Sequence, residues 1–201
     1  MPSYEKVKPE YAKLYESCIP NPRNVKTLNQ LVNKIVCGKA RYTEVCDPLG
    51  IPWLFVGIIH MLESNCDFTT HLHNGDSLNT RTVHVPPGRP RTGTPPFTWE
   101  ESAKDALAYE GFTSTQSWSL TAMLYKWEKY NGWGYRNETI NIPSPYLWAM
   151  SNHYTAGKFL EERINGKYKG VFHPEVASKQ CGAAVLLKHM ELSKIITLKK
   201  E

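Results

Sequence analysis

Residues 51–62, IPWLFVGIIHML, form an apolar run with almost no polar interruption. Pro52 suits the first turn of a helix, and a helix of this length is too short to cross a bilayer. A helix that is apolar all round must be packed on nearly every side, so we expect it at the centre of the core. Glu63 follows at its end, where burial and the negative end of the helix dipole both disfavour a charged carboxylate. The sequence therefore predicts a carboxyl group with a raised pKa at the edge of the core, suited to donating a proton.

A polar turn, His71-Leu72-His73-Asn74-Gly75-Asp76, supplies a second carboxylate. Asn-Gly is a strong turn signal. One carboxylate in an apolar setting and one in a polar setting is the arrangement that glycoside hydrolysis uses. His60 lies one helical turn before Glu63 and faces either the same cleft or the core, where a lone histidine on an apolar helix more commonly lies.

The chain of 201 residues is long enough for one substantial core, so we expect a single domain over residues 1–201. Six Trp and eleven Tyr residues suit a cleft that stacks on the apolar faces of sugar rings. The net charge of +5 without a dense basic run favours approach to an anionic polymer such as a bacterial cell wall and does not indicate nucleic acid. We expect a monomer that inserts into no membrane and needs no cofactor.

The five cysteines include no CxxC pair, so they imply neither a disulfide framework nor a structural zinc site. Free thiols are typical of a chain made in a reducing cytosol. The first residues, MPSYEKVKPEYAKLYESC, carry charges throughout and lack the apolar segment of a secretory signal peptide. We therefore expect a protein that is made in the cytoplasm and reaches a cell wall after cell lysis or through non-classical export.

Periodicity predicts a mainly helical chain with one β region, of the class α+β, mainly α. The predicted helices cover residues 4–17, 24–37, 51–62, 98–109 and 116–130, and a last helix opens at His173. The first helix belongs to an N-terminal arm at 1–23, and a Lys-rich tail follows the last one at 193–201. The helix at 98–109 begins with a capping box from Thr98 to Glu101. Residues 41–50 have the composition of a polar connection. Residues 80–85 alternate with period two before a proline-rich loop, which predicts a short strand.

Two further segments combine aromatic and polar residues. In YNGWGY, at 130–135, two glycines permit left-handed backbone and close approach of a ligand, or simply end the preceding helix. The segment SPYLWAMSNHY, at 144–154, is a second cluster of polar and aromatic residues. Both segments are candidate walls of a binding cleft.

Glu63-Ser64 at the end of a buried helix resembles the Glu-Ser signature of goose-type lysozymes and lytic transglycosylases, and Tyr130-Asn131-Gly132 resembles their later Tyr-Asn-Gly element. The order of these elements over residues 24–190 is similar to that of the lysozyme-like superfamily. The stretches HLHNGDSLNTRTVHVPPGRP and SPYLWAMSNHYTAGKF are also similar to uncharacterised bacterial and phage proteins of this group. The resemblance implies a helical lobe and a small β hairpin flanking a cleft, and a muramidase that cleaves the β-1,4 glycan backbone of bacterial peptidoglycan.

By this resemblance Glu63 is the general acid and Asp76 the carboxylate that activates water, with Thr82 as a hydrogen-bonding partner of that water. The candidate substrate-binding residues are His60, Ser64, His73, Tyr130, Asn131, Tyr135, Trp148, Asn152 and Tyr154, the last six being expected across the cleft from Glu63. Aromatic rings among them would stack on sugar faces, and amides would pair with N-acetyl groups. Because Asn74-Gly75 would let the Asp76 turn swing clear of Glu63, we expect the wide carboxylate spacing of an inverting hydrolase.

Other functions stay open at this point. A lytic transglycosylase needs no second carboxylate, since a hydroxyl of the substrate attacks, and chitin or chitosan is an alternative substrate. A zinc-dependent peptidase would use His60, His71 and His73 as ligands and Glu63 as base, although their spacing matches no metal motif. A non-catalytic sugar-binding module would use the same carboxylates only for hydrogen bonds to ligand hydroxyls.

Overall fold

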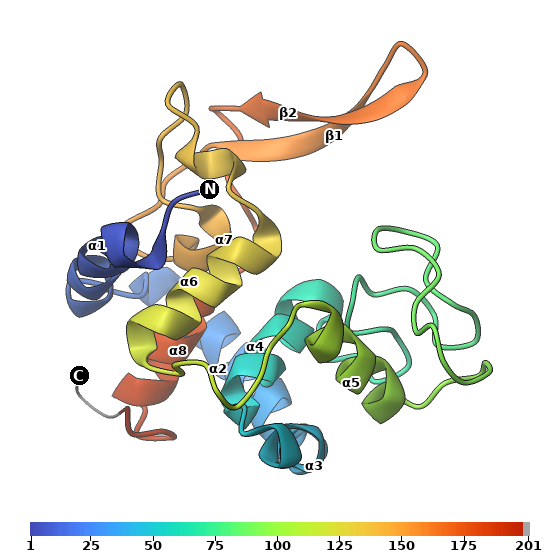
Figure 1. Cartoon of the computed structure of the whole chain (residues 1–201). Helices are drawn as coiled ribbons and strands as arrows, with labels where there is room; N and C mark the ends of the chain where they lie inside the picture. Colours follow the sequence, from blue (N-terminus) through green and yellow to red (C-terminus); the bar gives the residue numbers. More distant parts are fainter. Residues whose placement is uncertain (199–201) are drawn as a thin grey trace. The chain divides into compact units, whose positions relative to one another are not determined.

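The computed structural model describes residues 1–198, so the last three residues of the predicted Lys-rich tail lie outside it. The described chain contains eight α-helices and one two-stranded antiparallel hairpin (Figure 1), which confirms the expected class of α+β, mainly α. It divides into two compact units. We call residues 29–123 the central-helix unit and residues 1–28 with 124–198 the hairpin unit. No helix within residues 1–198 is both long and apolar enough to cross a membrane.

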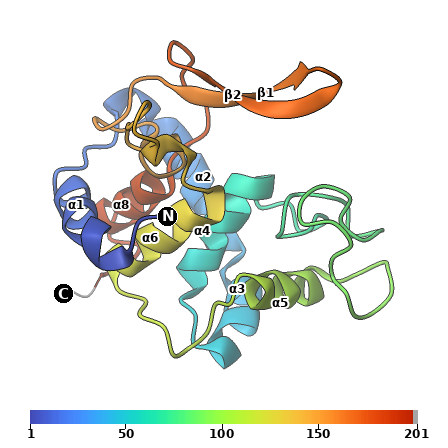
Figure 2. The ribbon, with the colours of Figure 1, turned by 45° about the horizontal axis from the view of Figure 1, so that its top comes forward.

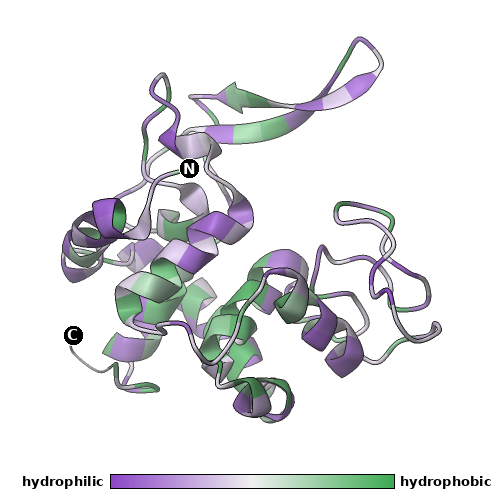
Figure 3. Ribbon diagram, in the orientation of Figure 1, coloured by the Kyte–Doolittle hydropathy of each residue, from purple (hydrophilic) through white to green (hydrophobic). Residues whose placement is uncertain are grey.

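The central-helix unit is built around the predicted apolar helix. It contains most of α2 (Val25–Cys37), with α3 (Lys39–Cys46), α4 (Trp53–Ser64) and α5 (Trp99–Tyr109). Every residue of α4 from Phe55 to Leu62 is buried, and Figure 3 shows this helix as apolar along most of its length. α3 packs against both α4 and α5. The helices predicted at 24–37, 51–62 and 98–109 are confirmed, and the capping box between Thr98 and Glu101 has both of its hydrogen bonds.

Gly57 explains how closely the neighbouring helices approach α4. A β-carbon built at Gly57 would lie 2.9 Å from Cγ2 of Ile35 on α2 and 3.0 Å from Cε2 of Tyr42 on α3. Both distances are shorter than van der Waals contact, so a larger residue would push these side chains away. A glycine inside a helix costs roughly 1 kcal/mol relative to alanine. The close packing of Ile35 and Tyr42 against α4 is the physical reason why a glycine lies at position 57.

The last turn of α4, which carries Glu63, is well formed. The helix starts after Pro52, which is the residue preceding it rather than its predicted first residue. Asn65 follows Ser64 in the left-handed conformation, with a φ of 56°. Main-chain N–H groups of the two residues after the helix donate back to carbonyls of its last turns, which satisfies groups that a helix end leaves unpaired.

The prediction of a polar connection over residues 41–50 was wrong. Helix α3 covers its first part, and a single 3₁₀ turn, Asp47–Leu49, follows. Tyr42, Val45 and Cys46 are completely buried at helical spacing. The apolar stripe of α3 is so short that the polar residues between its members, Thr43 and Glu44, conceal it. Contact with α4 stabilises a helix that its own sequence only weakly favours.

The prediction of a strand over residues 80–85 was also wrong, because this segment belongs to an irregular loop. The main-chain N–H of Thr82 donates to the carbonyl of Arg89 at 2.8 Å, and its carbonyl accepts from the N–H of Gly88 at 2.7 Å. Two further amides of the segment donate to the Asp76 side chain. The prolines that follow have no N–H to donate. The groups that a strand would use for pairing are therefore already bonded within the loop.

The hairpin unit combines short helices with the β hairpin, whose tip extends beyond the helices of the unit (Figures 1 and 2). Its elements are α1 (Tyr4–Glu16), most of α6 (Leu120–Asn131), α7 (Pro145–Trp148), α8 (Ala183–Leu192), β1 (Lys158–Ile164) and β2 (Lys167–His173). α7 and α8 pack together, and a β-carbon at Gly182 would lie 2.6 Å from the main-chain nitrogen of Trp148. The glycine before α8 is thus required for this contact.

The β hairpin lies at residues 158–173 and not at residues 80–85, where a strand was expected. His173 is the last residue of β2, so the helix predicted to open there was wrong, and α8 begins ten residues later at Ala183. Asn165 and Gly166 join the strands with φ values of 51° and 78°, a pair that suits a type I′ turn. This Asn-Gly dipeptide is a hairpin signal that the sequence contains, but charged residues in both strands hide the alternation around it.

Candidate functional site

Glu63 is half-buried in the last turn of α4, at the edge of the central-helix unit's core. Ser64, which follows it, is also half-buried, and its hydroxyl donates to the carbonyl of His60 at 3.3 Å. The apolar helix thus brings a carboxyl group out of the core, as the sequence predicted. Ser64 satisfies a carbonyl of the helix end.

The turn that carries Asp76 packs directly against this helix end. Gly75 has a φ of 80°, and a β-carbon built there would lie 3.2 Å from the main-chain carbonyl oxygen of Glu63. The turn is closed by the N–H of His71, which donates to the carbonyl of Asp76 at 2.6 Å. Only glycine combines this conformation with so close an approach. Asn74-Gly75 was expected to let the turn swing clear of Glu63, but it instead holds the turn against the helix.

Asp76 is an ionised carboxylate with only 11% of its side chain exposed. Its Oδ2 accepts the main-chain N–H groups of Val83 and His84 at 2.8 and 3.0 Å, and its Oδ1 lies 2.6 Å from Nδ1 of His84. Burial raises the pKa of Asp76, but the hydrogen bonds from His84 and Val83 outweigh it and lower the pKa to about 2. A carboxylate offers about four acceptor positions, so a single one remains, on Oδ1.

Thr82 lies in the same loop, where its hydroxyl makes two hydrogen bonds. It donates to the carbonyl of Pro86 at 2.5 Å and accepts the N–H of Arg89 at 2.9 Å, and the residue is 3% exposed. These bonds use the one proton of the hydroxyl that was expected to bind water, so towards water it can act only as an acceptor. The side chain of Thr82 is therefore buried in the interior of the loop.

The histidines of this unit are bonded to neighbouring side chains and main-chain groups. His60 is fully buried, with Nδ1 2.9 Å from the hydroxyl of Tyr42, and its Nε2 accepts the indole N–H of Trp99 at 3.1 Å. His71 lies in the polar turn between the hydroxyl of Ser102 and the carbonyl of Thr80, each at 2.8 Å. His60 therefore belongs to the core, and the structure does not bring it to a substrate-binding surface.

His73 is 7% exposed and contacts Oδ2 of Asp105 on α5 through Nε2, at 2.8 Å. Arg89 approaches the same oxygen at 2.9 Å. Burial lowers the pKa of His73, although Asp105 opposes this shift. Within residues 1–198 no group of three or more His, Cys, Asp or Glu side chains is arranged to hold a metal ion. Of the three histidines proposed as zinc ligands, His71 and His73 instead connect the Asp76 turn to α5, and His60 lies in the core.

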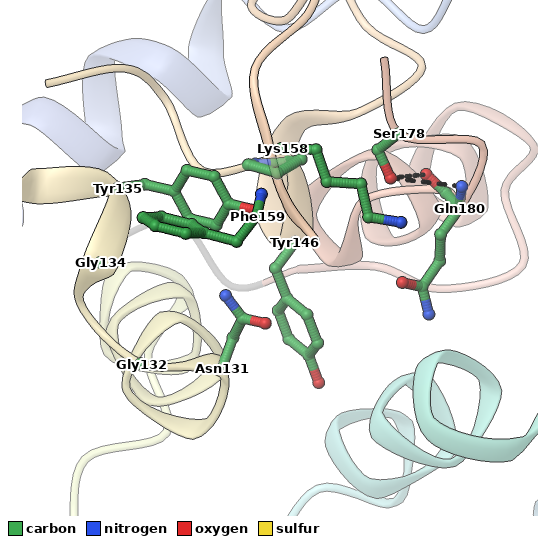
Figure 4. A pocket seen from close by; sticks show the side chains of 10 residues that line it. Asn131, Gly132, Gly134, Tyr135, Tyr146, Lys158, Phe159, Ser178 and Gln180 are labelled. Atoms are coloured by element: carbon green, nitrogen blue, oxygen red, sulfur yellow. Dashed lines mark hydrogen bonds between the residues drawn. The ribbon is translucent and has the colours of Figure 1, made fainter. Parts of the chain in front are cut away.

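A cavity of about 290 Å³ lies in the hairpin unit, where the Tyr-Asn-Gly turn faces the start of β1 (Figure 4). Its polar lining consists of Asn131, Tyr135, Tyr146, Lys158, Ser178 and Gln180, and two glycines, Pro145 and Phe159 complete it. The rings of Tyr135 and Phe159 meet edge to face, 5.1 Å apart, and form an apolar wall. This combination of one aromatic wall with amide, hydroxyl and ammonium groups suits a small polar ligand.

The Tyr-Asn-Gly turn is held in place by a buried ion-pair network. Glu128 on α6 accepts both Nε and Nη2 of Arg136 at 2.9 Å, and the hydroxyl of Tyr11 donates to it at 2.5 Å. Arg136 also donates to both oxygens of Glu10 at 3.0 Å. Gly132 ends α6 with a φ of 94°, which favours glycine. We call Glu128, Arg136, Tyr11 and Glu10 the Glu128 network.

The structure separates the six aromatic and amide residues predicted in this unit. Asn131 and Tyr135 line the cavity, and Tyr130 is half-buried at the end of α6. Trp148 is 1% exposed and belongs to the core. Asn152 is exposed, and its side chain bonds to main-chain groups of Ser17 and Ile19.

The hydroxyl of Tyr154 donates to the carbonyl of Gly157 and accepts the N–H of Ser178, both at 3.0 Å. It thereby supports the backbone next to the cavity rather than lining it. Sequence reasoning missed Tyr146, Lys158 and Gln180 as cavity residues. Tyr146 lies within the aromatic segment 144–154, but Lys158 and Gln180 carry no local signal, since only the fold brings them to this cavity.

Comparison of the chain with protein-family models, with curated proteins and with solved structures finds no match.

Proposed function

We propose that this protein is a glycoside hydrolase of the lysozyme-like type that cleaves the β-1,4 glycan backbone of bacterial peptidoglycan, with Glu63 as the general acid. The observation that carries the proposal is the packing of Gly75 against the main chain of Glu63, which keeps the Asp76 turn at the end of α4. Two carboxyl groups with contrasting surroundings, one at the end of an apolar helix and one in a polar loop, thereby belong to one compact unit.

In this proposal Glu63 protonates the glycosidic oxygen, and Asp76 stays ionised throughout. The free acceptor position on Oδ1 of Asp76 would orient and activate the attacking water, which corresponds to a single displacement with inversion. The cavity of the hairpin unit, with its aromatic wall and amide groups, supports a role in glycan binding.

A second candidate is a lytic transglycosylase acting on the same glycan. It is favoured by the low pKa of Asp76, about 2, and by the three hydrogen bonds that this side chain accepts from its own loop. A carboxylate of such low basicity is a weak base towards water. In this case Asp76 only shapes the loop, and a hydroxyl of the substrate attacks the anomeric carbon.

The deciding experiment incubates the purified full chain with peptidoglycan and determines product masses. Glu63→Gln keeps the shape of the side chain but has no proton to donate, so we expect a loss of activity of about a hundredfold or more with unchanged thermal unfolding. Wild-type turnover by this variant would remove Glu63 from the mechanism and refute the proposal.

Two variants then separate chemistry from loop anchoring at Asp76. Asp76→Asn removes the charge, whereas His84→Ala removes the side-chain partner of Asp76 but keeps the carboxylate. A hydrolase that uses Asp76 as base yields reducing ends, loses activity in Asp76→Asn and keeps most of it in His84→Ala. Anhydro-sugar ends and an active Asp76→Asn variant would instead identify the transglycosylase.

A further inference from the structure

Lys158 gives the cavity of the hairpin unit a selective chemistry. It is the single charged side chain among the cavity's lining residues, and it is half-buried at the first position of β1. Within residues 1–198 no carboxylate forms an ion pair with its ammonium group. Glu162, the acidic residue on the same face of the strand, is bonded to His173 at 2.7 Å.

The surroundings of Lys158 strengthen its attraction for an anion. An ammonium group has three donors and no acceptor, and in a partly desolvated cavity it interacts with a carboxylate more strongly than in water. Figure 4 shows the ammonium end of Lys158 and the amide of Gln180 on one side of the Tyr146 ring, and the amide of Asn131 on the other side. Amides and a hydroxyl at these positions suit the acetamido and hydroxyl groups of a sugar.

The volume limits what the cavity accommodates. At about 290 Å³ it is near the lower limit of small-molecule sites, roughly 300 Å³. It would therefore accept one sugar ring with its substituents rather than a longer stretch of glycan. The apolar wall of Tyr135 and Phe159 would contact the face of that ring.

We propose that this cavity selects a sugar unit bearing both an acetamido group and a carboxylate, and that Lys158 is the residue that recognises the carboxylate. The inference rests on the proposed function in that such a unit, N-acetylmuramic acid whose lactyl carboxylate carries no stem peptide, occurs in peptidoglycan and not in chitin. Lys158 is thus a specificity-determining residue, which favours glycan strands without stem peptides over neutral polymers of N-acetylglucosamine.

Three matched ligands test this by isothermal titration calorimetry on the full chain. They are N-acetylglucosaminyl-N-acetylmuramic acid, its methyl ester, and diacetylchitobiose, which lacks the lactyl group. We expect the wild type to bind the acid about three- to tenfold more tightly than either neutral ligand, and added salt to reduce this preference. Equal affinities for acid and ester in the wild type would overturn the inference without any mutation.

Three variants then assign the preference to its residue. Lys158→Gln should bind all three ligands alike, while Lys158→Arg should keep the preference because it keeps the charge. Lys167→Gln is the matched control, because Lys167 is an exposed lysine of the same hairpin that lines no part of the cavity. A Lys158→Gln variant that prefers the acid as strongly as Lys167→Gln would refute the role of Lys158.

These outcomes are independent of the proposed activity. A wild type that prefers the acid but does not cleave peptidoglycan would refute the proposed function and support the inference. A wild type that cleaves peptidoglycan but binds acid and ester equally would support the proposed function and refute the inference.

Discussion

At the scale of single residues, His60 of the central-helix unit is a structural group that depends on being neutral. His60 has no exposed surface and lies among Tyr42, Phe68 and Trp99. Burial lowers the pKa of His60 to about 4, although contacts with Asp67 oppose the shift. The folded state therefore binds fewer protons than the unfolded state between pH 4 and the ordinary pKa of 6.5. Stability that His60 contributes above pH 6.5 is lost as the pH falls through this window.

We predict that His60→Gln weakens this dependence on pH. In the wild type, His60 should account for a fall of about 2 kcal/mol in the free energy of unfolding between about pH 7 and pH 4.5. The variant lacks the titrating group, so its free energy of unfolding should start lower and decline less. Urea unfolding of both proteins across this pH range provides the measurement. Parallel declines would contradict the assignment of His60 as a buried neutral histidine.

At the scale of secondary-structure elements, the Glu128 network connects α1, α6 and the turn after α6. The side chain of Glu128 is 2% exposed and that of Arg136 is 19% exposed, so the pair is shielded from solvent. Burying two charges is costly, and such a pair adds little stability compared with apolar residues. Its value is geometric, because bidentate contacts from Arg136 to two carboxylates determine where the Tyr-Asn-Gly turn lies.

We predict that Arg136→Met lowers the free energy of unfolding by about 3 kcal/mol, because Glu128 would then be left as an unpaired buried charge. Arg136→Lys should recover part of this loss, since an ammonium group cannot make the same paired contacts. Arg163→Met, which changes an exposed arginine of β1, is the control and should have almost no effect. Equal losses in Arg136→Met and Arg163→Met, measured by chemical unfolding, would show that the Glu128 network contributes no specific stabilisation.

At the scale of the whole molecule, the net charge of +5 should draw the protein towards an anionic polymer. Screening shortens the range of this attraction from about 10 Å at 0.1 M salt to about 3 Å at 1 M. We predict that co-sedimentation with purified, anionic cell walls weakens progressively over this range, while binding to uncharged chitin changes little. Equal salt dependence for both polymers would indicate that net charge plays no part in wall association.

The sequence alone determined the elements whose stability is local or strongly periodic. The apolar run that became α4, the amphipathic α2 and the capping box of α5 all specify a helix through contacts between residues a few positions apart. The place of Glu63 at the end of α4 follows from the same pattern. These features of the fold and of the candidate site required no knowledge of distant neighbours.

Only the tertiary structure decided the features that depend on partners outside the segment concerned. α3 requires the surface of α4, and β1 requires β2 and the ring of Tyr135. Residues 80–85 form a loop because Asp76 and Arg89 take up their main-chain hydrogen-bonding groups. Likewise, His71 and His73 are bonded to α5, and Lys158 joins Asn131 in one cavity. A local pattern reports which conformation a segment prefers, whereas the partner of each polar group is determined by which segments the folded chain brings together.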